Sequence, residues 1–300
     1  TEVNDVIEAD FQHKKLQWAL RKQLAKQIEE KKYQACFILP NSFKSALIPW
    51  LANIPLRIGY RGEMRFGLIN VALDNPSKIN RPPMVEHYLA LSHLLNDTEQ
   101  SIDQAITPHL NVSQSAKQSV EAKLNKANIN LSEPNAAIYV LCPGAEYGVT
   151  KRWPTEHFAA LANEIISCNP NSQIILLGSQ GDQSLGQEIT SQTTPVSNIH
   201  NWCGSTSLDE AIALIGMSRA AVSNDSGLMH VAAALNIPQV AIFGSSDPSH
   251  TPPLSKQAKV IWLNLPCSPC HKRECPLGHL KCLKDILPQQ VLTTLHTLQS

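Results

Sequence analysis

The chain has 300 residues, 43% of them hydrophobic, and its 25 Lys and Arg residues balance 25 Asp and Glu residues. Because the charges balance, no global electrostatic field favours nucleic acid or an anionic membrane as a partner. The longest uninterrupted apolar run is about seven residues, far below the roughly 20 that span a bilayer, so we expect no transmembrane segment.

Short apolar runs alternate with helical patterns along the chain, which is typical of parallel sheets covered by helices. In the N-terminal half, the sequence predicts helices over 11–31, 42–52 and 84–96 and strands over 35–39 and 56–59. The polar stretch 111–134 is the best candidate for a domain boundary. We therefore predict an N-terminal domain over 1–132 and a C-terminal domain over 133–300.

In the C-terminal half, predicted strands and helices alternate more regularly. The sequence there predicts strands over 136–141, 173–177, 220–222 and 239–243 and helices over 155–167, 181–192, 207–218 and 226–235. A last helix over 289–298 is a candidate for packing on the N-terminal domain. The alternation predicts a doubly wound domain, in which ligands bind beyond the carboxyl ends of the strands. Pro143, Gly178, Asn224 and Gly244 each follow a predicted strand, so their four loops should converge on one crevice.

The first motif is Cys142-Pro-Gly-Ala-Glu-Tyr-Gly-Val-Thr-Lys-Arg-Trp-Pro154, at a strand-to-helix corner. One interpretation is an ordinary turn, with Trp153 as a packing residue and Pro154 at the first helical position. That interpretation leaves two glycines, Glu146 and the adjacent Lys151 and Arg152 unexplained. Lysine and arginine are favoured phosphate partners, so we predict that this loop binds phosphate. The loop is neither a Walker A motif nor a dinucleotide-binding fingerprint.

The second motif is Asn224-Asp-Ser-Gly-Leu-Met-His230. Asp225 or Asn224 stands where a helix N-cap belongs, Gly227 permits close approach of a ligand to the backbone, and His230 follows one turn after Ser226. The alternative interpretation is that Asp225 only caps an Ala-rich helix and that His230 is a core histidine. Since both corners lie at the same end of one predicted sheet, we predict that they hold one diphosphate between them.

The eight cysteines do not describe a disulfide-stapled secreted module. Four lie singly in or beside apolar segments and are interpreted as buried thiols: Cys36, Cys142, Cys168 and Cys203. The other four cluster at Cys267, Cys270, Cys275 and Cys282, with His271 and His279 between them. These ligand types suit a structural zinc ion, although their spacing is not that of a regular zinc ribbon, and free thiols of a reducing compartment are the leading alternative.

Six segments together resemble the bacterial ADP-heptose:lipopolysaccharide heptosyltransferases, specifically the heptosyltransferase II branch of glycosyltransferase family 9. The segments are Leu39-Pro-Asn-Ser-Phe-Lys-Ser45, Arg61-Gly-Glu-Met-Arg65, Pro143-Gly-Ala-Glu146, Lys151-Arg-Trp-Pro154, Asn224-Asp-Ser-Gly-Leu-Met-His230 and Thr251-Pro-Pro-Leu-Ser255. The resemblance covers essentially the whole chain. It implies an inverting transferase with two Rossmann-like doubly wound domains, the GT-B fold. It also implies a cytoplasmic enzyme, peripheral to the inner membrane of a Gram-negative bacterium.

The implied reaction transfers heptose from ADP-heptose to the heptosyl-Kdo2-lipid A inner core. Lys151 and Asp225 are the implied catalytic residues. The implied donor-binding set is Gly144, Ala145, Glu146, Lys151, Arg152, Ser179, Gln180, Asp225, Ser226, Gly227 and His230. Asn41, Ser42, Lys44, Arg61 and Arg65 lie in the half expected to face the anionic acceptor; their alternative interpretation is a solvated basic surface. Since the sequence has no Asp-x-Asp, we expect no catalytic cofactor, and protein cations must neutralise the diphosphate.

The sequence departs from the family pattern in two places. Family members begin with a strand and a glycine loop whose aspartate resembles the general base, and no segment here matches that unit. We therefore expect the N-terminal domain to lack its first strand-loop unit and the base to lie upstream of Thr1. Where some relatives have a glutamate after the Gly178 strand, this chain has Ser179, Gln180, Gly181 and Asp182. Two other functions stay open: a nucleotide-sugar 2-epimerase of the same fold, and a non-catalytic sugar-nucleotide-binding protein.

Overall fold

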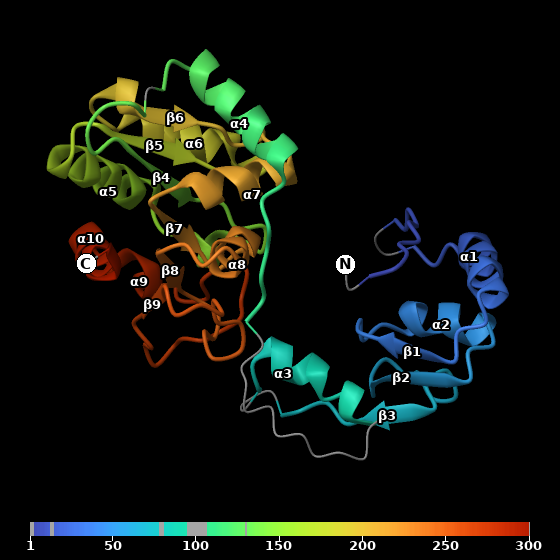
Figure 1. Cartoon of the computed structure of the whole chain (residues 1–300). Coiled ribbons are helices and arrows are strands. Elements are labelled where there is room, and N and C mark those ends of the chain that lie inside the picture. Colours follow the sequence, from blue (N-terminus) through green and yellow to red (C-terminus); the bar gives the residue numbers. More distant parts are fainter. Residues whose placement is uncertain (1–2, 13–14, 78–80, 95–106, 130, 300) are drawn as a thin grey trace. The chain divides into compact units, whose positions relative to one another are not determined.

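The structure, a computed structural model, describes residues 3–12, 15–77, 81–94, 107–129 and 131–299. The chain forms two compact units, Thr1–Asp103 and Gln104–Ser300 (Figure 1). No helix in these described ranges is both long and apolar enough to cross a membrane.

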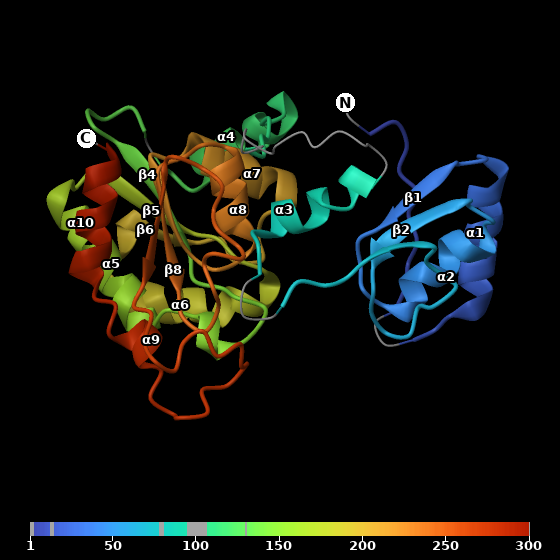
Figure 2. The ribbon, with the colours of Figure 1, turned by 90° about the horizontal axis from the view of Figure 1, so that it is seen from below.

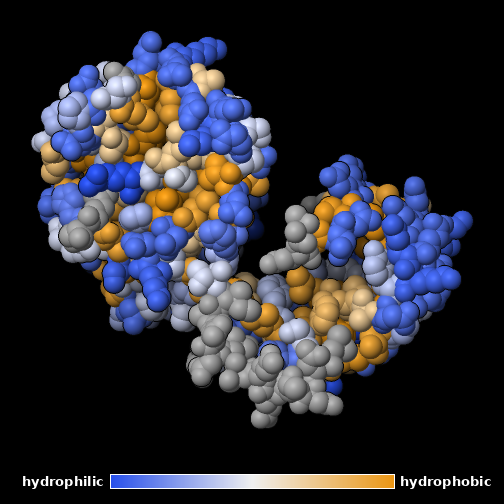
Figure 3. Space-filling model, in the orientation of Figure 1, coloured by the Kyte–Doolittle hydropathy of each residue, from blue (hydrophilic) through white to orange (hydrophobic). Residues whose placement is uncertain are grey.

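The N-terminal unit is built on a parallel sheet in the order β1-β2-β3. Its strands are β1 (Ala35–Ile38), β2 (Leu56–Tyr60) and β3 (Val71–Leu73), and its helices are α1 (Trp18–Glu30), α2 (Phe43–Leu51), α3 (Met84–Leu89) and the 3-10 turn η1 (Ser92–Leu94). Helix α2 packs on β1 and β2, and α1 packs on α2. Hydrophilic side chains cover the outer side of α1 (Figure 3), as its Lys-, Gln- and Glu-rich sequence predicts.

The C-terminal unit has one parallel sheet in the order β6-β5-β4-β7-β8-β9. The strands are β4 (Ala137–Cys142), β5 (Ser172–Leu176), β6 (Ile199–Asn201), β7 (Ala220–Asn224), β8 (Gln239–Phe243) and β9 (Ala258–Trp262). The helices are α4 (Gln114–Lys126), α5 (Thr155–Cys168), α6 (Gln183–Ser191), α7 (Leu208–Met217), α8 (Gly227–Ala234), α9 (Lys281–Lys284) and α10 (Pro288–Gln299), with 3-10 turns η2 (Val149–Lys151), η3 (Gln180–Asp182) and η4 (Val196–Asn198). The predicted α/β class is therefore confirmed.

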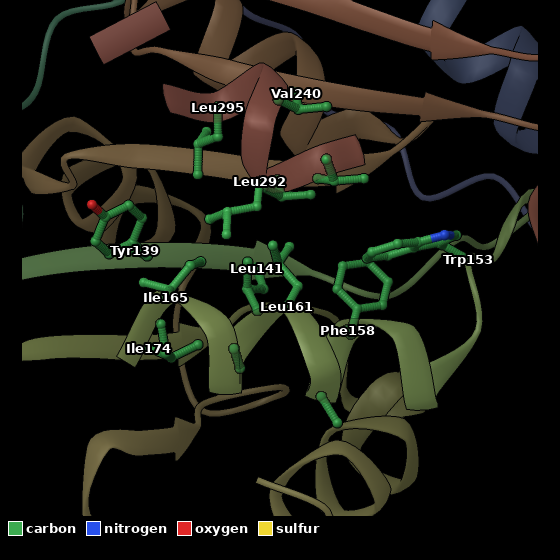
Figure 4. Packing of buried hydrophobic residues seen from close by; sticks show 14 of the residues in the cluster. Tyr139, Leu141, Trp153, Phe158, Leu161, Ile165, Ile174, Val240, Leu292 and Leu295 are labelled. Atoms are coloured by element: carbon green, nitrogen blue, oxygen red, sulfur yellow. The ribbon is translucent and has the colours of Figure 1, made fainter. Parts of the chain in front are cut away.

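Helices cover both faces of this sheet (Figure 2), with α5 and α10 on one side and α7 and α8 on the other. Both faces of the central strands are buried, so β4 reads as a continuous apolar run. Figure 4 shows Leu292 and Leu295 of α10 packed among Leu141 and Leu161. The last helix packs on α5, β8 and β9 of its own unit. Its packing on the N-terminal domain stays a prediction.

Helix α4 belongs to the C-terminal unit, whereas the sequence placed the domain boundary after it, at 132/133. Its buried Val120 and Leu124 join the core beneath α7. Ser119 and Lys123 reach across to Glu210 of α7, with distances of 2.6 Å from each side chain to the carboxylate. The segment is polar in composition because α4 lies at the surface and buries only a narrow stripe, and that stripe fixes it to α7.

Glu210 makes the link between α4 and α7 pH-dependent. The Lys123 and Ser119 side chains and the Ser207 N–H, which donates across 2.9 Å in a capping box, lower the pKa of Glu210 to about 2. Because the pKa of Glu210 is lower in the folded state than in the unfolded state, its ionised form stabilises the fold at every pH above the unfolded-state pKa. This stabilisation is lost as the pH falls toward 2. We expect Glu210→Gln to cost about 1 kcal/mol at pH 7 and progressively less below pH 4.5, in denaturant titrations. Glu188→Gln, which changes an exposed carboxylate on α6, is the control and should show no comparable pH-dependent loss.

Candidate active site

The two motifs meet where the sheet order reverses direction. Strands β4 and β7 are neighbours at the centre of the sheet, and their connections leave toward opposite edges, which makes their carboxyl ends the topological switch point. The Asn224 side chain ties the two corners together: its Nδ2 donates to the Pro143 carbonyl at 2.8 Å, and its Oδ1 accepts from the Trp153 N–H at 3.0 Å. The sequence-predicted convergence of the two loops is therefore present.

A buried ion pair lies between the corners. Lys151 Nζ contacts Asp225 Oδ2 at 2.5 Å, and the two side chains are 21% and 6% exposed. The Ser246 hydroxyl, from the loop after β8, donates to the same carboxylate oxygen at 2.5 Å. These partners fix the carboxylate and place the partly buried lysine ammonium at the switch point, where a charge is less screened than in bulk water.

The N-terminus of α8 opens onto the same place. Ser226 is the N-cap residue, with extended backbone angles, and no side chain caps the helix. The sequence assigned the cap to Asp225 or Asn224; that assignment is wrong, because both side chains are bonded elsewhere. The uncapped first turn leaves backbone N–H groups for an anion. A Cβ added at exposed Gly227 would meet no atom within 4 Å, so the space over this turn is open to a ligand.

His230 lies near this ion pair and is exposed rather than part of the core. Although the residue is exposed, surrounding protein atoms exclude part of the water around its ring, and this lowers its pKa from the ordinary value; the Asp225 carboxylate opposes the shift and the Lys151 ammonium adds to it. The ring is therefore neutral at pH 7 and can both donate and accept a hydrogen bond.

The remaining predicted donor-side residues divide into two kinds. Glu146, Ser179 and Gln180 are exposed on the loops that follow β4 and β5. Arg152 is engaged by the protein: its Nε donates to the Ala145 carbonyl at 3.2 Å, and its Nη2 lies 3.9 Å from Asp182 Oδ1. The adjacent cations thus differ, since Lys151 faces the switch point and Arg152 braces the loop.

Asp182, which the sequence left without a role, connects the β4 and β5 loops. Its Oδ2 accepts hydrogen bonds from the Ser179 N–H at 2.9 Å and the Ser179 hydroxyl at 2.7 Å. A Cβ added at Gly144 would lie far inside van der Waals contact with this buried carboxylate. Glycine at 144 is therefore required by the packing of Asp182, independently of any ligand.

We expect Gly144→Ala to destabilise the protein by about 1–3 kcal/mol, because the pinned carboxylate has no room to retreat. Urea denaturation measures the loss. Adding Asp182→Ala should recover part of it, since the methyl group then fits, and Gly181→Ala, whose Cβ would make ordinary contact at 3.6 Å, is the control. Equal stability of Gly144→Ala and the parent chain would contradict this account.

The sequence did not single out Tyr147 and Ser246, which contact Lys151 and Asp225 respectively. Lys151 Nζ lies 5.3 Å from the centre of the Tyr147 ring, and the Arg273 guanidinium lies 5.2 Å from it. The Tyr147 hydroxyl donates to the His271 carbonyl at 2.8 Å. Their only signal in the sequence is position: Tyr147 stands between two glycines, and Ser246 shortly follows a buried strand.

In the N-terminal unit, the predicted acceptor residues gather at the carboxyl ends of β1 and β2, but they are not equivalent. Arg65 is 3% exposed, and its guanidinium donates to the Pro40 and Tyr60 carbonyls and to Asn41 Oδ1. Arg61 is exposed and pairs with Asp74 at 2.8 Å. A hollow of about 400 Å³ is lined by Arg61, Gly62, Arg65, Phe66, Gly67, Ile69, Asn70 and Ala72. Arg65 thus holds the loop in shape, and Arg61 is the cation able to face a ligand.

Ser42 and Lys44 also have local partners. The Ser42 hydroxyl caps α2 by accepting from the Ser45 N–H at 3.2 Å. Lys44 Nζ donates to the Lys15 carbonyl at 3.2 Å, and the Lys44 carbonyl accepts from the buried Arg21 side chain. The role of Ser42 is therefore accounted for by the helix it begins.

A doubly wound sheet with cationic and N–H groups at its switch point is the arrangement in which α/β proteins commonly bind nucleotides. The model of glycosyltransferase family 9 (heptosyltransferase) matches residues 21–281. The chain belongs to this family, and the protein is a glycosyltransferase.

Individual relatives agree with the family match. The chain is 42% identical over 308 residues to lipopolysaccharide heptosyltransferase 2 of Salmonella typhimurium, which covers all of this chain and 85% of the relative. It is 41% identical to the Escherichia coli protein of the same name, over 99% of this chain and 84% of the relative. The solved E. coli ADP-heptose LPS heptosyltransferase II superposes with a TM-score of 0.76 at 40% identity, over 93% of this chain and 80% of that chain.

Proposed function

We propose that the protein transfers L-glycero-D-manno-heptose from ADP-heptose to the heptosyl-Kdo2-lipid A inner core of lipopolysaccharide. The observation that carries the proposal is the meeting of Lys151, Asp225 and the open N-terminus of α8 at the switch point of the C-terminal sheet. The full-length similarity to proteins named for this activity supports it.

The proposed reaction is one in-line displacement with inversion at the anomeric carbon. An acceptor hydroxyl attacks and gives up its proton to a base, and the bond from carbon to the diphosphate breaks as ADP leaves. The leaving diphosphate gains negative charge as that bond breaks. Lys151 and the N–H groups of the first turn of α8 are the groups placed to stabilise it.

The sugar end of the donor then faces Asp225 and His230. Lys151 and Ser246 both donate to the Asp225 carboxylate and stabilise its ionised form. Asp225 is therefore better suited to accept hydrogen bonds from sugar hydroxyls than to act as the base that removes a proton. His230, neutral and exposed at the same place, offers a second hydrogen-bonding group. Since these groups supply the neutralising charge, we propose that turnover needs no added divalent cation.

The acceptor half of the proposal rests on the N-terminal unit. Kdo carboxylates and core phosphates need cations, and exposed Arg61 borders the hollow formed by the connection from β2 to β3. Because the acceptor is anchored in a bilayer, we propose that the enzyme works in the cytoplasm, at the surface of the inner membrane. Co-sedimentation with vesicles that contain the acceptor, compared with vesicles that lack it, tests this location.

Calorimetric titration with ADP, UDP, GDP and CDP tests the donor assignment. We expect ADP to bind most tightly, and preference for another nucleotide would overturn the assignment. Incubation with ADP-heptose and acceptor should release ADP and form the heptosylated lipid. The epimerase alternative, which the relatives do not favour, requires a free epimerised sugar when nucleotide sugar is supplied without acceptor.

A further inference from the structure

A long segment without helix or strand, residues 263–280, connects β9 to α9 beside the active site. Segments of this length inside a compact domain are uncommon unless they carry a function or an internal cross-link. With Cys282 of α9, this segment contributes four cysteines. Because apolar residues are few in it, burial alone provides little to fix its shape.

The four cysteines converge on one small cavity. Cys267, Cys270, Cys275 and Cys282 line a space of about 20 Å³, and His279 borders the same space. Thr150, Ser245, Pro276, Leu277 and Leu280 complete the wall. All four cysteines are free thiols, so no disulfide accounts for their convergence. A space of this size accommodates an atom or ion and no organic ligand.

The backbone turns tightly after Cys275. The Gly278 N–H donates to the Cys275 carbonyl at 3.0 Å. Gly278 has a positive φ of 70°, which turns the chain back over the cysteine. His279 Nδ1 already accepts from the Lys281 N–H at 3.0 Å, so its other ring nitrogen is the one left for the cavity.

We propose that Cys267, Cys270, Cys275 and Cys282 hold a structural metal ion, zinc or iron, as four thiolates. Such a ligand set in tetrahedral geometry is characteristic of zinc and of rubredoxin-type iron. In the described ranges, no three His, Cys, Asp or Glu side chains already stand in coordinating positions. Binding therefore requires the thiols to move into coordinating positions and to release their protons.

The metal-bearing segment would brace the loop that carries Lys151. The Tyr147 hydroxyl donates to the His271 carbonyl, the Thr150 hydroxyl donates to the Lys272 carbonyl, and the His271 N–H donates to the Ser245 carbonyl at 2.8 Å. Gly148, with φ of 147°, passes so near the Arg273 carbonyl that a Cβ there would lie 2.8 Å from that oxygen. Ordering of 267–282 by a metal would therefore order the phosphate-binding corner as well.

Elemental analysis of the natively purified full chain tests the proposal. We expect about one zinc or iron per chain, and less than about one fifth of that in Cys270→Ser and Cys275→Ser, because three thiolates bind these ions far more weakly. Visible absorption distinguishes iron from colourless zinc. Cys168→Ser is the matched control and should keep its metal. The sequence interpretation of Cys168 as a buried thiol is wrong: it is exposed at the end of α5, outside the cluster.

Three results would overturn the site: parent chain purified from metal-supplemented cells with almost no zinc or iron, Cys270→Ser with undiminished metal, or a mass showing two intramolecular disulfides after native purification. If the serine variants do not fold, titrating the thiols of the parent chain with a mercurial must release one metal ion as the four clustered thiols react. None of these measurements uses donor or acceptor, so they stand apart from the proposed heptosyl transfer.

Discussion

Lys151→Met should weaken ADP binding by about 10- to 100-fold and lower turnover by about 100- to 1,000-fold. The substitution keeps the length and apolar stem of the side chain and removes only the ammonium group. That ammonium lies at the switch point, 2.5 Å from Asp225, and it is partly buried, so its charge would interact with a diphosphate more strongly than in bulk water. The effect on turnover should exceed the effect on binding because charge on the diphosphate increases as the sugar bond breaks. Calorimetry and steady-state kinetics measure the two effects separately.

Lys123→Met is the matched control for this prediction. Lys123 also forms an ion pair in the same unit, with Glu210 at 2.6 Å, but it lies between α4 and α7. Its loss should change stability and leave ADP affinity unaltered. Because Lys151→Met leaves the Asp225 carboxylate buried without its cation, a second variant with Asp225→Asn added should recover stability without recovering ADP affinity. Unchanged ADP affinity in folded Lys151→Met would remove Lys151 from the site.

The sequence predicted the strands that lie in the middle of the large sheet, because these are buried on both faces. Strands β4, β5, β7 and β8 read as short apolar runs and were found within one or two residues of their bounds. The edge strands were missed. Strand β6 is only Ile-His-Asn, and β9 has a single buried residue, Ile261, after exposed Lys259 and Val260. Edge strands carry little apolar signal, so their assignment depends on pairing with a neighbour.

The sequence predicted the positions of the two loops, because local backbone order determines them. It did not predict the side-chain partners, because these depend on contacts between distant segments. The two corners follow from a strand, small residues and a helix, and this local order suffices to place both at one end of the sheet. The cap at Ser226 was not predictable, since Asp225 is a better capping residue in isolation and only the folded chain brings it to Lys151 and Ser246. Arg65 likewise looks like a surface cation in sequence, while in the structure it holds backbone carbonyls.

A substitution at Gly227 should change ADP affinity without lowering the free energy of unfolding. No atom lies within 4 Å of a Cβ added there, and its φ is not positive, so an added side chain fits the protein without strain. Gly227→Ala should therefore keep or slightly raise the free energy of unfolding, because glycine is a poor helix former. The same methyl group occupies the space that a phosphate needs to reach the backbone N–H groups of α8. ADP affinity should fall about 10-fold, as measured by calorimetry.

A charged side chain introduced at position 227 tests which part of the donor lies over this turn. It should repel a diphosphate but not a neutral part of the donor. Gly227→Asp and Gly227→Asn have side chains of nearly equal size, and aspartate in the first turn favours the helix itself. If the diphosphate sits over this turn, the aspartate variant should bind ADP about tenfold more weakly than the asparagine variant while unfolding at equal or higher denaturant concentration. The gap should narrow as salt is added, since the repulsion is screened. Equal ADP affinities of the two variants would place the diphosphate elsewhere, because a negative charge added beside a bound diphosphate has to weaken its binding.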